Sequence, residues 1–283
     1  MTEIGTPTLA GTSGPPPAPA LPPHPTNTRR VVGWSIALAI LIGLLVYSWI
    51  DTSASLTQLW TGLVGKQGLF RSVLPESVPP QANQFWPAIR AAATTFAIAL
   101  LSIAFGVIGS LLMLPLAARN IAPSRALYEL SRLIQAILRA IPELIMLLLF
   151  NVVLGFSPFA AVVALTLHGI GVKGKLYAEA VEEMDMSAVD ALRIAGASRL
   201  QVFLHAVLPG VRNTLTGLTL YRLDANFRSA VTLGAVGGGG IGFLIDNELS
   251  IFQFKAVMTY VIVLVIVVLL VERVSTELRA RLA

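Results

Sequence analysis

The 283-residue chain is too apolar for a water-soluble domain, because 55% of its residues are hydrophobic and only 12% are charged, against about 25% charged residues in a typical soluble domain. It has no cysteine, which excludes disulfides, thiolate metal sites and a cysteine nucleophile. The formal charge of +5 is spread between apolar blocks, which argues against nucleic-acid binding and fits the positive-inside bias of membrane proteins.

Residues 1–28 are rich in proline, glycine, threonine and alanine, and Glu3 is their only charged residue. Such a segment buries too little apolar surface to fold, so we expect a disordered cytoplasmic tail. The tail does not have the pattern of a signal peptide, because no basic residue precedes an apolar stretch before Arg29 and Arg30.

Residues 29–87 are predicted to form a peripheral first span and an external connection. Val31–Ile50 has the roughly 20 apolar residues that a spanning helix needs, with Trp34 and Trp49 near its ends as interfacial anchors. The connection, residues 51–87, has apolar residues at helical spacing, which indicates either an amphipathic helix on the membrane surface or a plain external loop: Leu56, Leu59, Trp60, Leu63 and Val64.

Residues 88–283 are predicted to form the core of an all-α membrane protein with about six spans in total. The block Ala88–Leu116 is rich in small residues, which let helix backbones approach closely inside a bundle. The remaining apolar blocks each have about the length that a bilayer requires: Ile134–Val153, Pro158–Val172, Thr214–Ala235 and Ala256–Val271.

The basic residues between these blocks orient the chain. With six spans they all fall on one side, which the positive-inside rule assigns to the cytoplasm. Both termini of a multi-pass protein of the plasma (inner) membrane are therefore expected inside. The residues are Arg29, Arg30, Arg119, Arg125, Arg132, Lys173, Lys175, Arg193, Arg199, Arg273, Arg279 and Arg281.

The motifs of nucleotide-binding sites and hydrolases are absent or incomplete. Gly169, Gly174 and Lys175 match part of a phosphate-binding loop, but Leu176 stands where a metal-binding serine or threonine belongs. The glycines of residues 237–242 match a dinucleotide fingerprint without the strand–turn–helix unit that it needs. No H-E-x-x-H or G-x-S-x-G is present, so no catalytic or metal-ligating residue is predicted.

His168 lies inside a predicted span. It is interpreted either as a hydrogen-bonded packing residue or as a functional group, because ionisable residues inside membranes tend to be functional.

The longest polar stretch between spans, Lys173–Pro209, is predicted to be a cytoplasmic loop that docks onto a partner. Ser187 and Asp190 have the spacing of a capping box, which predicts a short helix over Ala188–Ala195. Gly196 then ends the helix, as glycine does where a left-handed residue is required.

A second capping box follows the glycine. Ser198 and Gln201 have its spacing and predict a helix that ends before Leu208–Pro209. The docking surface is expected to be apolar and to lie on the first of the two helices, through Val189, Leu192 and Ile194.

This segment resembles the cytoplasmic signature of the permeases of ATP-driven (ABC) importers: Glu-Ala-Ala, three residues, Gly, nine residues, Ile, one residue, Leu-Pro. The aligned residues are Asp190-Ala191-Leu192, Gly196, Ala206 and Leu208-Pro209. Asp, Leu and Ala replace the Glu, the second Ala and the Ile of the signature. The resemblance implies that Asp190, Ala191, Leu192, Gly196, Ser198, Leu208 and Pro209 couple the chain to a separate ATPase subunit.

Residues 85–275 also resemble the permease subunit of phosphonate importers, in the segments Arg139–Leu144, Glu179–Glu182, Gly196–Arg199, Tyr221-Arg222 and Leu233–Phe243. The resemblance implies the fold of a type I ABC importer permease, with a core of about five helices per subunit. It implies as partners a second copy of the chain, an ATPase dimer and an extracytoplasmic solute-binding protein, and no nucleic acid. ATP and magnesium would bind the ATPase, so no cofactor is expected on this chain.

Five charged residues lie in predicted spans: Arg139, Glu143, Arg222, Asp224 and Arg228. Arg139 and Glu143 are four residues apart, as are Asp224 and Arg228, so each pair is expected to share a helix face. Pro142 is expected to kink the helix between the first two. The charges are predicted either to pair and fix the bundle or to line a translocation pathway for an anion.

The predicted function is the permease subunit of an importer for phosphonate or a related oxyanion such as phosphite or phosphate. The chain would work by alternating access and would itself catalyse no reaction. Two alternatives are a secondary transporter, which usually has inverted repeats with broken helices, and a membrane scaffold that transports nothing.

Overall fold

The computed structural model describes residues 28–53 and 55–281, and the side chains of residues 31–53 and 55–281. Over these residues the chain is helical and contains no strand. It divides into two compact units, Met1–Trp60 and Thr61–Ala283. The predicted tail lies outside the described residues, except for Thr28, which begins the first helix.

The first unit contains helix α1 (Thr28–Asp51), which includes the predicted first span. The side chains described in α1 are all exposed, and the helix is long and apolar enough to cross a membrane. Helix α2 (Leu56–Val64) follows where the sequence indicated an amphipathic helix or a loop. The segment is therefore helical, and its position on a membrane surface stays a prediction.

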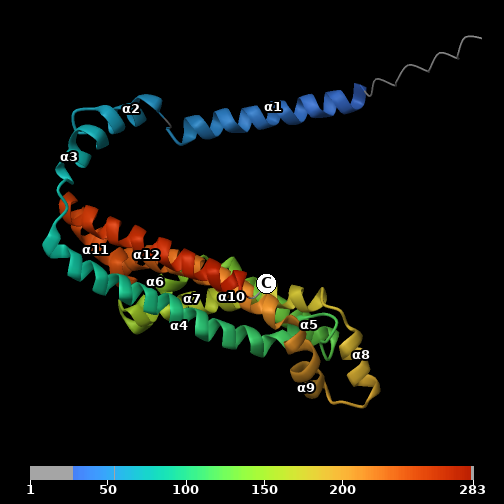
Figure 1. Cartoon of the computed structure of the whole chain (residues 1–283). Helices are drawn as coiled ribbons and strands as arrows, with labels where there is room; N and C mark the ends of the chain where they lie inside the picture. Colours follow the sequence, from blue (N-terminus) through green and yellow to red (C-terminus); the bar gives the residue numbers. More distant parts are fainter. Residues whose placement is uncertain (1–27, 54, 282–283) are drawn as a thin grey trace, which may run out of the picture. The chain divides into compact units, whose positions relative to one another are not determined.

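The second unit is a helical bundle whose long members are α4 (Phe85–Ala117), α7 (Pro158–Glu182), α10 (Leu208–Leu233) and α12 (Phe254–Ala280). They run side by side in Figure 1. The pair α4 and α7 has the most extensive contact, and α7 also contacts α10. Short helical turns lead into α4: η1 (Leu69–Val73), α3 (Leu74–Glu76) and η2 (Ala82–Gln84).

Two bent helix pairs complete the bundle. Helices α5 (Arg125–Ala140) and α6 (Glu143–Leu154) meet at 87°, and the helix ending in η4 (Gly234–Gly238) meets α11 (Gly240–Ser250) at 54°. The described residues thus hold four helices that could cross a membrane singly, or six spans if each bent pair counts as one. The prediction of an all-α membrane protein with about six spans is confirmed.

The bend at Ile141–Pro142 corrects one prediction. Proline has no backbone N–H and disfavours a helical conformation in the residue before it. Ile141 is accordingly extended, with φ −81° and ψ 118°, and α5 ends at Ala140. The predicted span Ile134–Val153 is therefore two helices, and the prediction that Arg139 and Glu143 share a helix face is wrong.

Helix α7 extends further than the sequence suggested. The predicted span ended at Val172, because two lysines follow, whereas α7 continues to Glu182. The first part of the predicted loop 173–209 therefore belongs to the bundle, and Lys173 is fully buried in it.

Small residues let α5 approach α7. A Cβ atom at Gly171 would lie 2.8 Å from the backbone nitrogen of Arg139 and from the carbonyl oxygen of Gln135. Since backbone atoms cannot move aside as a flexible side chain can, only glycine fits at this crossing.

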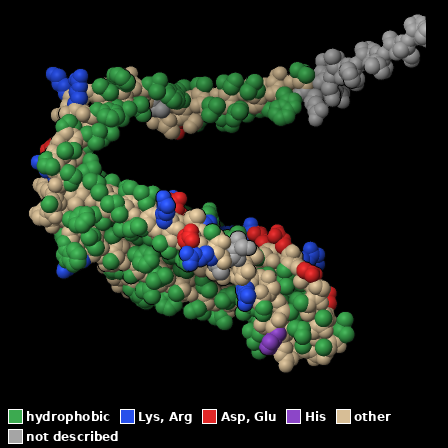
Figure 2. Space-filling model, in the orientation of Figure 1, with side chains coloured by type: hydrophobic (Ala, Val, Ile, Leu, Met, Phe, Trp, Pro, Cys, Tyr) green, Lys and Arg blue, Asp and Glu red, His purple; other side chains and the backbone are tan. Residues whose placement is uncertain are grey.

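Hydrophobic side chains cover most of the visible face of the bundle, and charged side chains gather toward the end that carries α8 (Ser187–Ile194) and α9 (Arg199–Val202) (Figure 2). An apolar surface of this extent on helices of spanning length is what a bilayer requires.

Candidate functional site

The corner between α8 and α9 has the geometry that the sequence predicted. Gly196 has φ +82°, in the left-handed region. Its N–H donates to the carbonyl of Arg193, and the N–H of Ala197 donates to the carbonyl of Leu192, which is a Schellman motif. The glycine corner is confirmed.

The second capping box is also confirmed. The Ser198 hydroxyl accepts from the Gln201 N–H at 3.4 Å, and the Gln201 side chain accepts from the Ser198 N–H at 2.8 Å. These two bonds satisfy donors that the start of α9 would otherwise leave free.

The first capping box is wrong. Ser187 is the first residue of α8, and Met186 precedes it without a side-chain cap. The Asp185 carboxylate accepts instead from the N–H of Ser187 at 3.0 Å and from its hydroxyl at 2.7 Å. Both bonds stabilise the ionised carboxylate, so they lower the pKa of Asp185. The contact therefore holds at neutral pH and is lost as the pH falls through this lowered pKa.

The second helix does not end before Leu208–Pro209 as predicted. The π-helical turn η3 (Phe203–Val207) joins α9 to α10 without a break, and the N–H of Leu208 donates to the carbonyl of Phe203, five residues back. Pro209 cannot donate a hydrogen bond, and it sits in the first turn of α10. The wider π turn accommodates the proline where an interior position of an α-helix would clash.

The exposed face of α8 differs from the predicted docking surface. Val189 is fully buried, in a cluster with Leu114 of α4 and Val202 of α9, and Leu192 packs against the same cluster. Ile194 is 88% exposed, and Ala188 and Ala191 are exposed beside it. A partner would therefore contact Ile194 and the exposed alanines beside it.

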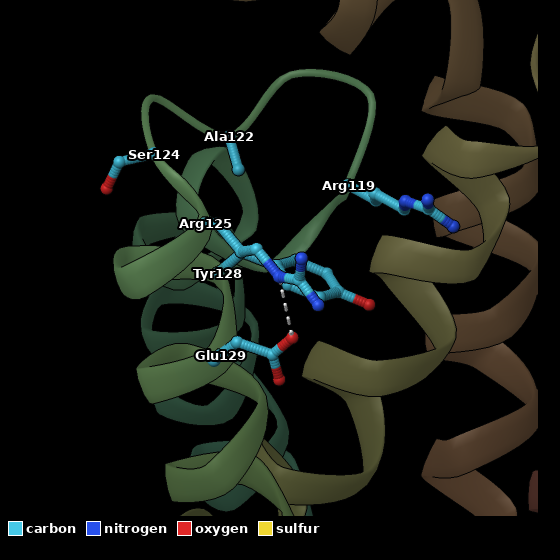
Figure 3. Close-up of a pocket in the computed structure, with 6 residues that line it drawn as sticks. All are labelled: Arg119, Ala122, Ser124, Arg125, Tyr128 and Glu129. Carbon is cyan, nitrogen blue, oxygen red and sulfur yellow. Dashed lines mark ion pairs between the residues drawn. The ribbon is translucent and has the colours of Figure 1, made fainter.

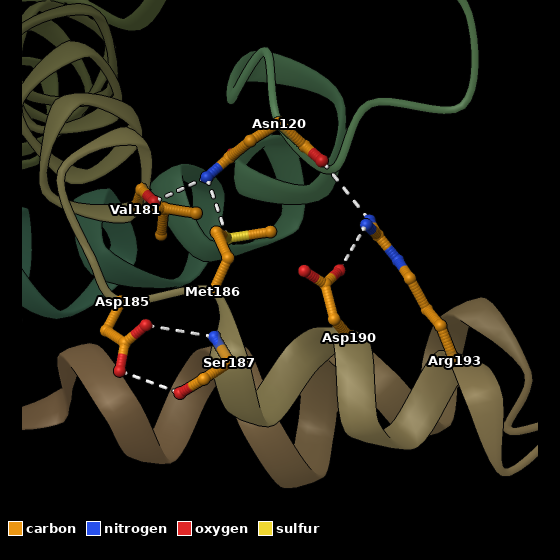
Figure 4. Close-up of polar contacts among 7 residues, drawn as sticks. All are labelled: Asn120, Val181, Asp185, Met186, Ser187, Asp190 and Arg193. Atoms are coloured by element: carbon orange, nitrogen blue, oxygen red, sulfur yellow. Dashed lines mark hydrogen bonds and ion pairs between the residues drawn. The ribbon is translucent and has the colours of Figure 1, made fainter.

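The segment from α7 to α8 is tied to the connection between α4 and α5 (Figure 4). The Asn120 side chain donates to the carbonyl of Val181 at 2.7 Å and lies 3.2 Å from the sulfur of Met186. Arg193 donates to the backbone carbonyl of Asn120 at 3.2 Å and pairs with Asp190 at 3.3 Å. Asn120 thus bridges the end of α7 and the start of α8.

A second tie lies beside Asn120. The Arg119 N–H donates to Glu182 at 2.8 Å, and Arg132 of α5 lies 3.8 Å from the other oxygen of the same carboxylate. Motion of α8 would therefore reach α4, α5 and α7 together.

An open pocket of about 430 Å³ lies at the same connection, lined by Arg119, Ala122, Ser124, Arg125, Tyr128 and Glu129 (Figure 3). Arg119 points away from the other five, and Arg125 pairs with Glu129 at 3.9 Å while both stay largely exposed. An exposed pair of this kind contributes little, so we assign no binding role to this pocket.

The charges in the bundle form two separate groups. Glu143, at the start of α6, accepts from the Ser229 hydroxyl at 2.5 Å and lies 3.5 Å from His168 Nε2. Glu143 also interacts electrostatically with Arg222 of α10. Asp224 pairs with Arg228 one turn further along α10, as their spacing predicted.

Arg139 joins neither group. It is exposed in the last turn of α5, on the other side of the bend. His168 Nδ1 lies 3.4 Å from the carbonyl oxygen of Ile141, next to that bend, so the structure favours the interpretation of His168 as a hydrogen-bonded packing residue.

Sequence reasoning missed a polar stripe on α10 that faces the other helices. Its members recur at spacings of three and four, the helical signal that could have found it. The Tyr177 hydroxyl of α7 lies 2.5 Å from Thr219, and Asn226 donates to Ser102 of α4 at 3.1 Å. The stripe consists of Thr219, Arg222, Asn226 and Ser229.

Residues 116–281 match the family of inner membrane components of binding-protein-dependent transport systems. The chain belongs to this family. It is 36% identical to the phosphite transport system permease protein PtxC of Stutzerimonas stutzeri, over 88% of the chain and 90% of the relative. It is 34% identical to the phosphate-import permease protein PhnE of Mycolicibacterium smegmatis, over 86% of the chain and 45% of that longer relative.

A solved structure with a similar fold is the MetNI methionine ABC transporter in inward-facing conformations. It aligns with a TM-score of 0.63 at 24% identity and covers 72% of the chain and 99% of that structure's chain. The bundle therefore has the fold of a type I ABC importer permease.

The chain is the permease subunit of an ABC importer in the inner membrane, and not an enzyme. Family membership implies an ATPase and a solute-binding protein as partners. It also decides against the secondary transporter and the scaffold that the sequence left open.

The bridge at Asn120 gives a prediction. Asn120→Ala removes the donor to Val181, and a lost hydrogen bond of this type costs about 1–1.5 kcal/mol, which is roughly a tenfold change in an opening equilibrium. Amide hydrogen exchange in residues 183–196 should therefore speed up about tenfold. Ser124→Ala is the control, since it removes the cap of α5 and should leave these residues unchanged. Equal exchange in Asn120→Ala and the wild type would contradict the bridge.

Proposed function

We propose that this permease imports phosphonate or a related oxyanion such as phosphite or phosphate. The observation that carries the proposal is the similarity, over nearly nine-tenths of the chain, to a permease named for phosphite. The charge of α10 supports it, because Arg222 and Arg228 outnumber Asp224 in this helix. A net positive charge inside the membrane lowers the barrier for an anion.

The proposed mechanism is alternating access by an assembly of two copies of the chain, an ATPase dimer and an extracytoplasmic solute-binding protein. ATP binding would close the ATPase dimer and draw the two copies of α8 together, and the pathway would then open outward to receive the solute. ATP hydrolysis, with ATP and magnesium on the ATPase, would reset the cycle.

The residues proposed for coupling form two groups. The exposed side chains of Asp190 and Ala191, on α8, are available to a partner. The other five residues are proposed to position α8. Leu192 packs on the cluster beneath α8, and Gly196 and Ser198 fix the corner. Leu208 and Pro209 begin α10.

The pathway is proposed to involve the groups around Glu143 and Arg222 and the pair of Asp224 with Arg228. Glu143 and Arg222 come from α6 and α10 and interact across the bundle, so a relative motion of these helices would change the local field. Arg139, exposed beyond the bend, is the proposed pathway residue with the least contact to the other four.

Uptake into proteoliposomes tests the proposed solute. The permease, its ATPase and the solute-binding protein are reconstituted together. ATP-dependent uptake of labelled phosphate, phosphite and methylphosphonate is measured separately, each with the other two or sulfate in excess as competitor. We expect inhibition by phosphite or methylphosphonate and none by sulfate. Two results would contradict the proposal: the permease copurifies with no ATPase, or the complex accumulates none of the three phosphorus oxyanions.

The orientation gives a second test. We expect both termini in the cytoplasm, because the basic residues between spans fall on one side. Reporter fusions at Gln67, which follows α2, and at Ser187, which begins α8, should then report opposite sides, with Ser187 inside. The same side for both positions would contradict the proposed topology.

The corner at Gly196 gives a third test. A left-handed backbone costs a non-glycine residue roughly 1–2 kcal/mol, and a Cβ there would meet no atom within 4 Å. Gly196→Val therefore strains the corner without a clash. We expect normal insertion but a sharp fall in uptake, with the ATPase lost or hydrolysing without solute control.

The control for Gly196→Val is Gly217→Val, because a Cβ at Gly217 also meets nothing within 4 Å and this glycine lies within helix α10. Asp190→Ala should be milder, since it removes only the exposed pair with Arg193, worth about 0–1 kcal/mol. If Gly196→Val couples normally, the corner does not contribute to the ATPase contact.

A further inference from the structure

Lys173 is a fully buried amine in the middle of α7. Its Nζ atom has no hydrogen-bond partner within the described part of the chain. Two glycines form the niche that holds it. A Cβ at Gly169, one turn earlier on α7, would lie 2.8 Å from Nζ, and a Cβ at Gly106 of α4 would lie 2.9 Å from Cε. The lysine therefore occupies space that any larger side chain at either glycine would fill.

An ammonium group in such a niche is energetically unfavourable. Burial removes its hydration, and only a counter-charge or hydrogen-bond acceptors can replace it. Tyr177, one turn after Lys173 on α7, bonds to Thr219, about one turn before Arg222 on α10, so the two cations lie at the same helix crossing. The charge that acts on Lys173 from α10 therefore has the same sign. The structure thus holds an uncompensated positive charge where α4, α7 and α10 meet.

Arg222 is also incompletely satisfied. Its Nε atom is buried and has no hydrogen-bond partner among the residues described. Glu143 acts on Arg222, but this carboxylate already accepts from Ser229 and lies beside His168. The Asp224 carboxylate pairs with Arg228. Glu143 therefore acts on Arg222, Lys173 has no carboxylate partner among the residues described, and a positive excess remains.

Some neighbouring polar groups have partners. Asn226 donates to Ser102, and Tyr177 and Thr219 bond to each other. Buried side-chain atoms of Gln135, Thr166 and Asp224 also have no partner among the residues described. Lys173 and Arg222 are the positively charged groups of this set, and positive charge is what an oxyanion requires. Phosphorus oxyanions accept hydrogen bonds from both ammonium and guanidinium groups.

We propose that Lys173 and Arg222 form an oxyanion-binding site that is closed in this conformation and opens to the solute in another stage of the transport cycle. The site rests on the proposed function and deepens it, since it names residues that contact the solute. Lys173 lies two helical turns before Val181, which Asn120 ties to the α4–α5 connection. A shift of α8 on ATP binding would therefore be transmitted along α7 to Lys173.

The first experiment compares Lys173→Gln with Lys175→Gln in the reconstituted complex. Lys175 is the matched control, because it lies on the same helix but is partly exposed and pairs with Glu179 at 3.4 Å. We expect Lys173→Gln to raise the phosphite concentration that half-inhibits labelled phosphate uptake by about tenfold, and to lower uptake, with the ATPase still retained in the complex. Lys175→Gln should behave as the wild type.

The second experiment uses the absence of cysteine from the chain. In Lys173→Cys, the introduced thiol is treated with aminoethyl methanethiosulfonate, which forms a disulfide and restores an ammonium group at the end of a side chain close to lysine in length. We expect no labelling of the resting complex, labelling of the complex trapped with ATP and vanadate, and recovery of uptake after labelling. The neutral methyl methanethiosulfonate should label in the same state without recovery.

A thiol that reacts in no state, or uptake in Lys173→Gln equal to that of the wild type, would overturn the site and leave the importer assignment intact. Recovery with the neutral reagent would also overturn it, since packing and not charge would then matter. A wild-type complex that transports no phosphorus oxyanion is a different result. It would contradict the proposed solute, and the proposed oxyanion site would then be rejected as well.

Discussion

The close packing of α4 against α7 is the constraint on which the rest of the bundle depends. Hydrophobic attraction does little between helices in lipid, so small side chains that let backbones approach are what hold such a pair together. At this contact, Gly109 of α4 leaves room for the Ile170 side chain of α7, and Gly106 leaves room for that of Lys173. On its other side α7 receives α5 across Gly171, and α6 packs along it as well. Since α7 contacts α4, α5, α6, α10 and η4, a shift of this one element changes most of the interior.

Polar contacts at one end of the bundle connect α7 to neighbouring elements, so a movement of one of them is passed to the others. Asn120 and Glu182 join the α4–α5 connection to the end of α7, and Arg193 joins the same connection to α8. A surface that moves with a partner is therefore linked to the helices that carry the interior charges. The stripe on α10 continues the link, because Ser229 bonds to Glu143 on α6 and Asn226 bonds to Ser102 on α4.

The sequence predicted what depends on neighbouring residues. The approximate number of spans follows from apolar runs along the chain, and the glycine corner at Gly196 and the cap at Ser198 are local features; the structure confirms all three. The cap at Ser187 failed because Asp185 offers a competing acceptor two residues away, and a spacing rule cannot rank two nearby carboxylates. The pairing of Arg139 with Glu143 failed because Pro142 divides the helix between them.

The burial of Lys173 could not be read from the sequence. Hydropathy windows end a span at a charged residue, and the niche that holds this lysine depends on Gly106, which lies in a different helix. Contacts between α4 and α7 are decided by the packing of the whole bundle, and a single sequence carries no signal for them. The docking surface of α8 was misjudged for the same reason, because Val189 packs against residues of α4 and α9.

Because α9, η3 and α10 form one continuous helix, a movement at one end is transmitted along its whole length. One uninterrupted rod runs from Arg199 to Leu233, about 50 Å at 1.5 Å per residue, which exceeds the roughly 30 Å of a bilayer's hydrocarbon core. When a partner holds the end of this helix that projects beyond the lipid, a small tilt at that end produces a larger displacement at the other end. The far end leads into η4 and its glycines, where the backbone leaves helical geometry at Val236 and Gly237. A tilt of this helix would therefore be passed directly to a segment whose backbone is not helical.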